Sequence, residues 1–136
     1  MDSQNKDFIP SLRGNGERIL LVEDYEEVRF LAQEILSTNG YTVFSAQSAK
    51  DAATLFEKES GRFDLVFSDM VLPGKSGVKL VEELLNLGKF AVLFASGYSG
   101  EKADWDYINS NNFRFLQKPY DIQDLLAAVK EVLGKK

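Results

Sequence analysis

The chain has 136 residues, of which 44% are hydrophobic and 27% charged, a size and composition typical of one globular domain. Its formal net charge of -5 argues against nucleic-acid binding, and the absence of cysteine and histidine excludes disulfides, thiolate chemistry and imidazole catalysis. No apolar run is long enough to span a bilayer or to serve as a secretion signal, so we expect a cytoplasmic protein without membrane insertion.

The chain starts with a polar segment and then alternates short apolar runs with helical patterns. Residues 1–17 are polar and contain Pro10, Gly14 and Gly16 without sustained periodicity, which predicts a flexible tail or linker. We therefore expect the folded domain to cover residues 18–136. Short apolar runs rich in β-forming residues predict five buried strands, at residues 19–22, 41–45, 63–67, 90–94 and 113–116.

Helical spacing of apolar residues follows each predicted strand. Four patterns are regular, and their buried stripes are predicted at Val28, Leu31, Ala32 and Ile35, at Ala49, Ala52, Ala53 and Phe56, at Val78, Val81, Leu84 and Leu85, and at Ile122, Leu125, Leu126 and Val129. Ser48 and Asp121 are expected to cap the second and last of the five helices. Residues 99–110 have an irregular apolar face, so we expect this fourth helix to be the loosest.

Strands that alternate with helices predict an α/β fold, a doubly wound five-stranded parallel sheet with five helices and the flavodoxin-like order 2-1-3-4-5. In this order the first and third strands are neighbours at the point where the winding reverses. The polar residues that follow the strands then share one edge of the sheet, and they are Glu23, Asp24, Asp69, Ser96 and Lys118.

Carboxylates crowded at such an edge repel one another unless a cation lies among them, which implies a divalent metal. With oxygen ligands alone, Mg²⁺ is the expected ion, and it usually also holds a phosphoryl group. Lys118 and Ser96 offer a charge and a donor to phosphoryl oxygens. An aspartate in this place can form an acyl phosphate, and Asp69, in the middle of the sheet, is best positioned to do so.

Taken singly, each of these residues also has a structural explanation. Glu23 and Asp24 would be favourable charges at the start of the first helix, Lys118 a solvated loop lysine and Ser96 a turn residue. Their occurrence together at one sheet edge favours a functional site.

From residue 18 to the C-terminus the chain resembles the receiver domains of two-component response regulators. The resemblance rests on the ends of the predicted strands, namely Glu23-Asp24, Asp69 with Pro73 and Gly77 in the loop behind it, Ser96, and Lys118-Pro119. It implies a phosphorelay domain that catalyses only its own phosphorylation and dephosphorylation. The phosphoryl group would come from the phosphohistidine of a partner histidine kinase or histidine phosphotransfer domain, onto Asp69. A monomer or a weak dimer is expected.

The resemblance also assigns roles at the site. Asp24 and Asp69 would ligate Mg²⁺ together with the backbone carbonyl of Val71, and Glu23 would act through a metal-bound water. Lys118 and the hydroxyl of Ser96 would bind the phosphoryl group, and the Lys118-Pro119 peptide would be cis. Phosphorylation would then repack the face formed by the fourth helix, fifth strand and fifth helix around Phe115.

Three residues depart from the family's usual pattern. Phe115 stands where a tyrosine is common, so its ring could repack a surface but could not donate a hydroxyl hydrogen bond. Val71 and Tyr98, two residues after Asp69 and Ser96, are apolar and aromatic rather than small or acidic. We hypothesise that they shield the acyl phosphate from water and slow its hydrolysis.

Two other functions fit parts of the pattern. A Mg²⁺-dependent aspartyl-phosphate hydrolase resembles this site but usually has a second Asp at the position of Val71. A flavodoxin-like electron carrier would need a hydroxyl-rich loop after the first strand, where this chain has the acidic VEDYEEV.

The stretch DFIPSLRGNGERILLVED resembles the junction between an ATP-binding kinase domain and a C-terminal receiver in hybrid histidine kinases. The chain is therefore expected to be either an excised receiver or a free-standing regulator.

Overall fold

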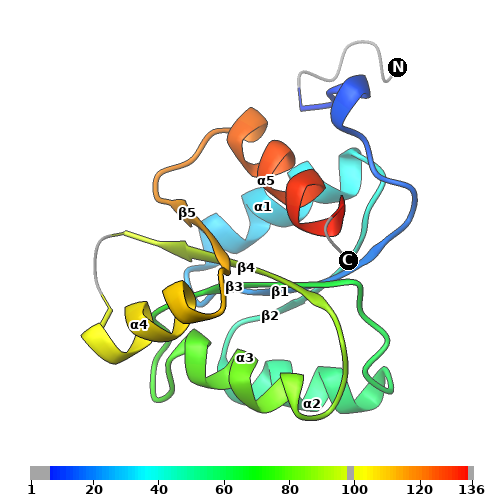
Figure 1. Cartoon of the computed structure of the whole chain (residues 1–136). Helices are drawn as coiled ribbons and strands as arrows, with labels where there is room; N and C mark the ends of the chain where they lie inside the picture. Colours follow the sequence, from blue (N-terminus) through cyan, green and yellow to red (C-terminus); the bar gives the residue numbers. More distant parts are fainter. Residues whose placement is uncertain (1–6, 98–99, 135–136) are drawn as a thin grey trace.

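A five-stranded parallel sheet in the order β2-β1-β3-β4-β5 forms the centre of the protein (Figure 1). The computed structural model describes residues 7–97 and 100–134. The strands are β1 (Arg18–Val22), β2 (Thr42–Ala46), β3 (Leu65–Asp69), β4 (Ala91–Ser96) and β5 (Arg114–Gln117). The predicted doubly wound fold is therefore confirmed, with β1 and β3 hydrogen-bonded neighbours.

Helices cover both faces of this sheet. They are α1 (Glu26–Thr38), α2 (Ala49–Lys58), α3 (Gly77–Leu85), α4 (Lys102–Ser110) and α5 (Ile122–Gly134). In Figure 1, α1 and α5 lie on one face, while α2, α3 and α4 lie on the other. Because successive strand residues point to opposite faces, Leu20 and Val22 pack with α2 and α3, whereas Ile19 and Leu21 pack with α1 and α5. The sheet therefore has an apolar core on each side.

Short polar contacts fix where several helices start. The hydroxyl of Ser48 accepts a hydrogen bond from the Asp51 amide, 3.0 Å away, and the carboxylate of Asp121 accepts one from the Asp124 amide, 2.7 Å away. These are the two predicted caps. Ser76 caps α3 in the same way, so each of these helices has one of its free amide groups paired.

The structure corrects the predicted stripes at three positions. Leu31 is 58% exposed and Leu36 is buried in its place, because the buried face of α1 runs through Ala32, Ile35 and Leu36. Ala53 in α2 is also exposed, as is Ala103 in α4, one of the apolar residues in the irregular face of residues 99–110. In α4, which is described in full, Ile108 is the one buried residue, which agrees with the irregular apolar face of this segment.

The described part of the predicted tail contacts the domain. Residues Pro10–Leu12 form a turn of 3-10 helix, and Ile9 and Leu12 pack against the core on the α1 and α5 side. The buried side chain of Asn39 accepts a hydrogen bond from the Ile9 amide and donates one to the Asp7 carbonyl, at 2.8 and 2.7 Å. This segment thus lies against the end of α1 before the chain enters β1.

None of the helices in the described ranges combines the length and the apolar character that crossing a bilayer requires.

Candidate functional site

Acidic and basic side chains gather where the parallel strands end. Glu23 and Asp24 directly follow β1, Asp69 is the last residue of β3, and Lys118 directly follows β5. The Nζ atom of Lys118 lies 2.6 Å from Oε1 of Glu23 and 3.0 Å from Oδ2 of Asp69. The sheet therefore brings together the four charged residues that the sequence placed at this edge.

The three carboxyl groups are close enough to share a cation. One carboxylate oxygen from each of Glu23, Asp24 and Asp69 lies within 4.8 Å of the others. Glu23 is buried and Asp69 is half-buried, whereas Asp24 is exposed. An all-oxygen donor set that is open to solvent on one side suits Mg²⁺, which keeps several of its waters. Three carboxylates around the single ammonium of Lys118 leave a net charge of -2, which a divalent ion would balance.

Burial and mutual repulsion govern the protonation of these groups. Burial raises the pKa of Glu23 above its ordinary value, with the charge of Asp69 adding to the effect, although hydrogen bonds from Lys118 and the Tyr25 amide oppose it. Burial likewise raises the pKa of Asp69, and here Asp24 adds the repulsion while Lys118 and the Val71 amide oppose it. The site without metal thus holds its carboxylates under electrostatic strain.

Lys118 offsets part of this strain. Its burial disfavours the ammonium, but the hydrogen bonds to Glu23 and Asp69, together with their charges, raise the pKa of Lys118 overall. The lysine is therefore a permanent positive charge at neutral pH. Tyr120 follows Lys118-Pro119 and its ring contacts that of Phe67 in β3, and burial followed by the charges of Glu23 and Asp69 raises the pKa of its hydroxyl. Tyr120 was not among the predicted site residues, and its one sequence signal is its place directly after Lys118-Pro119.

Backbone and hydroxyl hydrogen bonds hold the chain around Asp69. The amide of Met70 donates to the Ala95 carbonyl at 2.9 Å, and the amide of Gly77 donates to the Met70 carbonyl at 2.8 Å. The Ser68 hydroxyl donates to the Asp69 carbonyl at 2.9 Å. The loop between β3 and α3 is thereby folded back beside Asp69, which fixes where its carboxylate emerges from the sheet.

The other predicted site residues that the structure describes lie at the end of β4, in β5 and in the loops that follow β3 and β5. Ser96 ends β4 with 1% of its surface exposed, and its carbonyl accepts a hydrogen bond from the Lys118 amide at 2.8 Å. The Lys118-Pro119 peptide is cis, the isomer implied by the family resemblance. Val71 is 44% exposed beside Asp69. Tyr98 lies outside the described residues. Phe115 is half-buried in β5 and its ring packs edge-on against Trp105 of α4, a contact that the sequence did not predict.

An apolar groove adjoins the charged cluster. It has a volume of about 390 Å³ and lies between α1 and the loop after β5, lined by Val28, Leu31, Ala32, Lys118, Pro119 and Tyr120. Leu31, which the sequence predicted to be in the core, instead forms part of this exposed surface.

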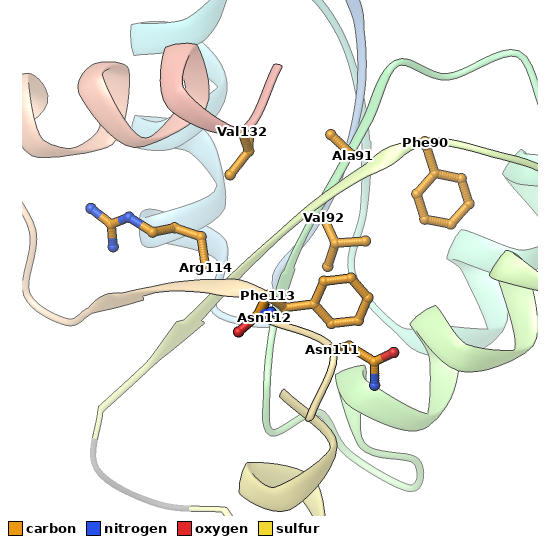
Figure 2. A pocket seen from close by; sticks show the side chains of 8 residues that line it. All are labelled: Phe90, Ala91, Val92, Asn111, Asn112, Phe113, Arg114 and Val132. Atoms are coloured by element: carbon orange, nitrogen blue, oxygen red, sulfur yellow. The ribbon is translucent and has the colours of Figure 1, made fainter. Parts of the chain in front are cut away.

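A second hollow lies far from this chemistry. It has a volume of about 320 Å³ and lies where β4 and β5 begin, at the sheet edge opposite Asp69 (Figure 2). Its lining residues carry no carboxylate, and the Arg114 side chain points away from the phenyl rings toward Glu131, 3.2 Å from it. This hollow offers no set of groups comparable with that around Asp69.

Comparisons with known proteins agree with this geometry. The family model described as "Response regulator receiver domain" matches residues 19–130. The chain is 36% identical over 118 residues to the sensor kinase CckA of Brucella abortus (strain 2308), covering 86% of this chain and 12% of the kinase. It is 29% identical over 121 residues to sporulation initiation phosphotransferase F of Bacillus subtilis (strain 168), covering 88% and 96% of the two chains.

Solved structures give the same result. The receiver domain from the hybrid histidine kinase CckA superposes with a TM-score of 0.73 at 36% identity, over 85% of this chain and 98% of that one. A CheY-like receiver domain protein from Methanospirillum hungatei JF-1 superposes with a TM-score of 0.78 at 27% identity, over 89% and 96%. Since the family model covers most of the chain and the fold agrees with it, this chain belongs to the response regulator receiver domains, the phosphoacceptor domains of two-component systems.

Proposed function

We propose that Asp69 is the phosphoacceptor of this receiver domain. The observation that carries the proposal is the contact of Lys118 with both Glu23 and Asp69 beside a third carboxylate, at the ends of adjoining strands. An Oδ atom of Asp69 would attack the phosphorus of a phosphohistidine. The new O–P bond forms as the N–P bond breaks, and the imidazole leaves with the electron pair of that bond and takes up a proton.

The residues around Asp69 suit this transfer. The ammonium of Lys118, already 3.0 Å from Oδ2, would pair with the phosphoryl oxygens as their charge builds. Bound Mg²⁺ would supply charge neutralisation for the same oxygens. Asp24, Asp69 and the Val71 carbonyl would hold the ion, and Glu23 would do so through a water. The net charge of -2 at the site supports this assignment.

Phosphorylation would act as a switch through Ser96 and Phe115. Ser96 ends the strand next to Asp69, so a small movement would bring its hydroxyl to a phosphoryl oxygen. The surface formed by α4, β5 and α5 would then repack around Phe115, shifting the population between two arrangements. The single buried residue of the described α4 supports this, because few core contacts oppose its displacement.

Val71 and Tyr98 are proposed to slow the loss of the phosphoryl group. The exposed isopropyl group of Val71 would lie where other members of the family place small or acidic residues, and would hinder an attacking water. Val71 has no titratable group, so the hydrolase alternative would lack its general acid. A phosphoryl lifetime that shortens in Val71→Asp and in Tyr98→Glu would agree with this role, whereas an unchanged lifetime in both would contradict it.

The partner is proposed to be a histidine kinase or a histidine phosphotransfer domain. The exposed side chain of Leu31 and the apolar groove that ends at Lys118 support a protein donor, because an apolar surface beside the reacting group gives a helix a place to pack. The similarity to a receiver within the sensor kinase CckA makes a hybrid kinase the proposed context, with a free-standing regulator as the alternative.

Incubation with acetyl phosphate and Mg²⁺, followed by intact-mass spectrometry, tests the assignment. The wild-type chain should gain the mass of one phosphoryl group, and Asp69→Asn should gain none. Asp106→Asn, an exposed aspartate of α4 paired with Lys102, is the matched control and should be labelled like wild type. Continuous release of phosphate without a stable adduct would favour the hydrolase, and a labelled Asp69→Asn chain would overturn the proposal.

A further inference from the structure

The single tryptophan of the chain, Trp105 in α4, packs against the ring of Phe115 in β5. We propose that Trp105 is a positioning residue that holds Phe115 in the arrangement seen here and so sets how readily the domain switches. This inference rests on the proposed function, because it concerns the switch that phosphorylation of Asp69 would drive.

The first observation is the ring contact itself. The rings of Trp105 and Phe115 have centroids 4.9 Å apart and planes at 83°, the edge-to-face geometry that stabilises aromatic pairs. Both side chains are half-buried, so the contact lies at the margin of the core rather than in solvent. Phe115 cannot rotate away or move inward without losing this contact, unless α4 moves with it.

The second observation is a packed path from Asp69 to the same tryptophan. Met70, next to Asp69, is fully buried. A Cβ atom on Gly100 would lie 3.1 Å from Cε of Met70 and 3.3 Å from Nε1 of Trp105, so the Gly100 backbone lies beside both of these side chains. Asp69, Met70, Gly100 and Trp105 are thus neighbours in series, and a backbone displacement at Asp69 would have this packed route to Trp105.

The third observation is how α4 is held. Within this helix, as described, Ile108 is the one buried residue, and the first turn is tied to α3 by a hydrogen bond between Asp104 and Ser76. In Figure 1 the helix lies beside β5, apart from α1 and α5. The ring contact of Trp105 with Phe115 joins α4 to β5, and the contact of Tyr107 with Phe113 joins it to the residue directly before this strand.

These three observations give Trp105 a definite role. The contact stabilises the arrangement without phosphate and is lost when Phe115 repacks, so it lowers the population of the switched arrangement. Removing the indole should raise that population by the factor that one aromatic pair contributes, roughly 3- to 10-fold. A ligand that binds the switched arrangement should then bind more tightly by the same factor.

Beryllofluoride with Mg²⁺, a mimic of the phosphoryl group, is the probe for this effect. Its affinity is measured by calorimetry for wild type, Trp105→Ala and Tyr107→Ala. Tyr107 is the matched control, since it is a half-buried aromatic residue on the same helix whose ring contacts Phe113 instead of Phe115. Trp105→Ala should bind roughly 3- to 10-fold more tightly, Tyr107→Ala like wild type, and Trp105→Phe in between.

A purely structural role of Trp105 predicts no gain in beryllofluoride affinity when the indole is removed. If the indole only stabilises the fold, Trp105→Ala should bind beryllofluoride with equal or lower affinity, and that result would overturn the inference. Equal gains in beryllofluoride affinity in Trp105→Ala and Tyr107→Ala would overturn the inference too, because they would assign the effect to loosening of α4 as a whole. Circular dichroism checks that each variant is folded, and Trp105→Phe serves as the conservative variant if alanine is not tolerated.

Fluorescence separates this inference from the proposed function. Because Trp105 is the single tryptophan, its emission should change when acetyl phosphate and Mg²⁺ are added and should stay constant in Asp69→Asn. A chain that gains a phosphoryl group by mass while its emission stays constant would refute the role of Trp105 and leave the phosphoacceptor assignment intact. A chain that gains no phosphoryl group would instead refute the proposed function.

Discussion

Gly77 lies so close to Asp69 that a Cβ atom at position 77 would overlap the Asp69 carbonyl oxygen and come within 2.6 Å of Oγ of Ser68. The first residue of α3 therefore packs directly on the backbone of Asp69. This close approach explains why the loop that follows β3 needs a residue without a side chain at its end.

Gly77→Ala should therefore damage both the fold and the site. The overlap involves backbone, which cannot turn away as a flexible side chain would, so we expect the free energy of unfolding to fall by about 2 kcal/mol or more. Labelling by acetyl phosphate should fall as well, since Asp69 would be displaced. Gly134→Ala is the control, because nothing lies within 4 Å of its added Cβ. Urea unfolding with no difference between the two variants would contradict this reading.

The carboxylates at the site should reduce stability when no metal is bound. Burial and repulsion raise the pKa of Asp69 and of Glu23, so stability is fully present below their ordinary pKa of about 4 and falls as pH rises through the raised values. At pH 7 without Mg²⁺, the free energy of unfolding of Asp69→Asn should exceed that of wild type by about 1 kcal/mol, the size of a typical single-residue effect. The difference should vanish below pH 4.

Mg²⁺ should make wild type more stable than Asp69→Asn. At ten times its Kd the ion should stabilise wild type by about 1.4 kcal/mol through binding to the folded state, and should stabilise Asp69→Asn much less. Melting temperatures with Mg²⁺ and with chelator measure both effects. Asp106→Asn, at an exposed pair with Lys102, should stay within about 0.5 kcal/mol of wild type in all conditions. Equal stabilisation of wild type and Asp69→Asn would argue against metal binding at Asp69.

Tyr41 should make stability fall at alkaline pH. Its hydroxyl is buried without a hydrogen-bond partner among the described residues, and burial, aided by the charge of Glu17, raises the pKa of Tyr41 from 10.0 to about 12. The folded state thus resists ionisation that the unfolded chain undergoes. The contribution of Tyr41 to the free energy of unfolding is fully present below pH 10. It is lost as pH rises to 12, which lowers the free energy of unfolding by up to about 2 to 3 kcal/mol.

Tyr41→Phe removes the ionising group and isolates this contribution. The variant should be as stable as wild type or more stable at pH 7, because no hydrogen bond is lost, and its advantage should grow between pH 10 and 11. Tyr25→Phe, at a side chain that is 60% exposed, should melt like wild type at each pH. A constant difference between Tyr41→Phe and wild type from pH 8 to 11 would contradict the prediction.

Asn39 should anchor the segment before β1. Its side chain is fully buried and joins the backbone of Asp7, Ile9 and Ile35, with each distance between 2.7 and 2.8 Å. Asn39→Ala would remove the side-chain partner of the part-buried Ile9 amide and Asp7 carbonyl, whereas the Ile35 carbonyl keeps its hydrogen bond from the backbone amide of residue 39. We expect a loss of about 2 kcal/mol and faster hydrogen exchange at the Ile9 amide. Asn111→Ala removes one exposed hydrogen bond to Tyr107 and should change stability by less than about 0.5 kcal/mol. Similar losses in both would contradict an anchoring role.

The order of the strands and the identity of the edge residues follow from the sequence alone. Apolar runs that end on Asp24, Asp69 and Lys118 are a local signal, because each run is short, buried and closed by turn residues. Parallel strands need helical crossovers, so the alternation predicts a parallel sheet whose strands share one carboxyl edge. The order 2-1-3-4-5 was expected because it is the common one for five such strands. The caps at Ser48 and Asp121 are equally local, since they depend on residues three positions apart.

The tertiary structure decided what depends on residues distant in sequence. Helical spacing cannot tell which of two adjoining apolar residues faces the sheet. The exposure of Leu31 and the groove it lines depend on how α1 packs beside the loop after β5. The polar segment before β1 carries no periodic signal, yet it is held by Asn39, thirty residues from Ile9. Likewise, the pairing of Trp105 with Phe115 and the approach of Gly77 to Asp69 arise from packing between elements, which no local pattern encodes.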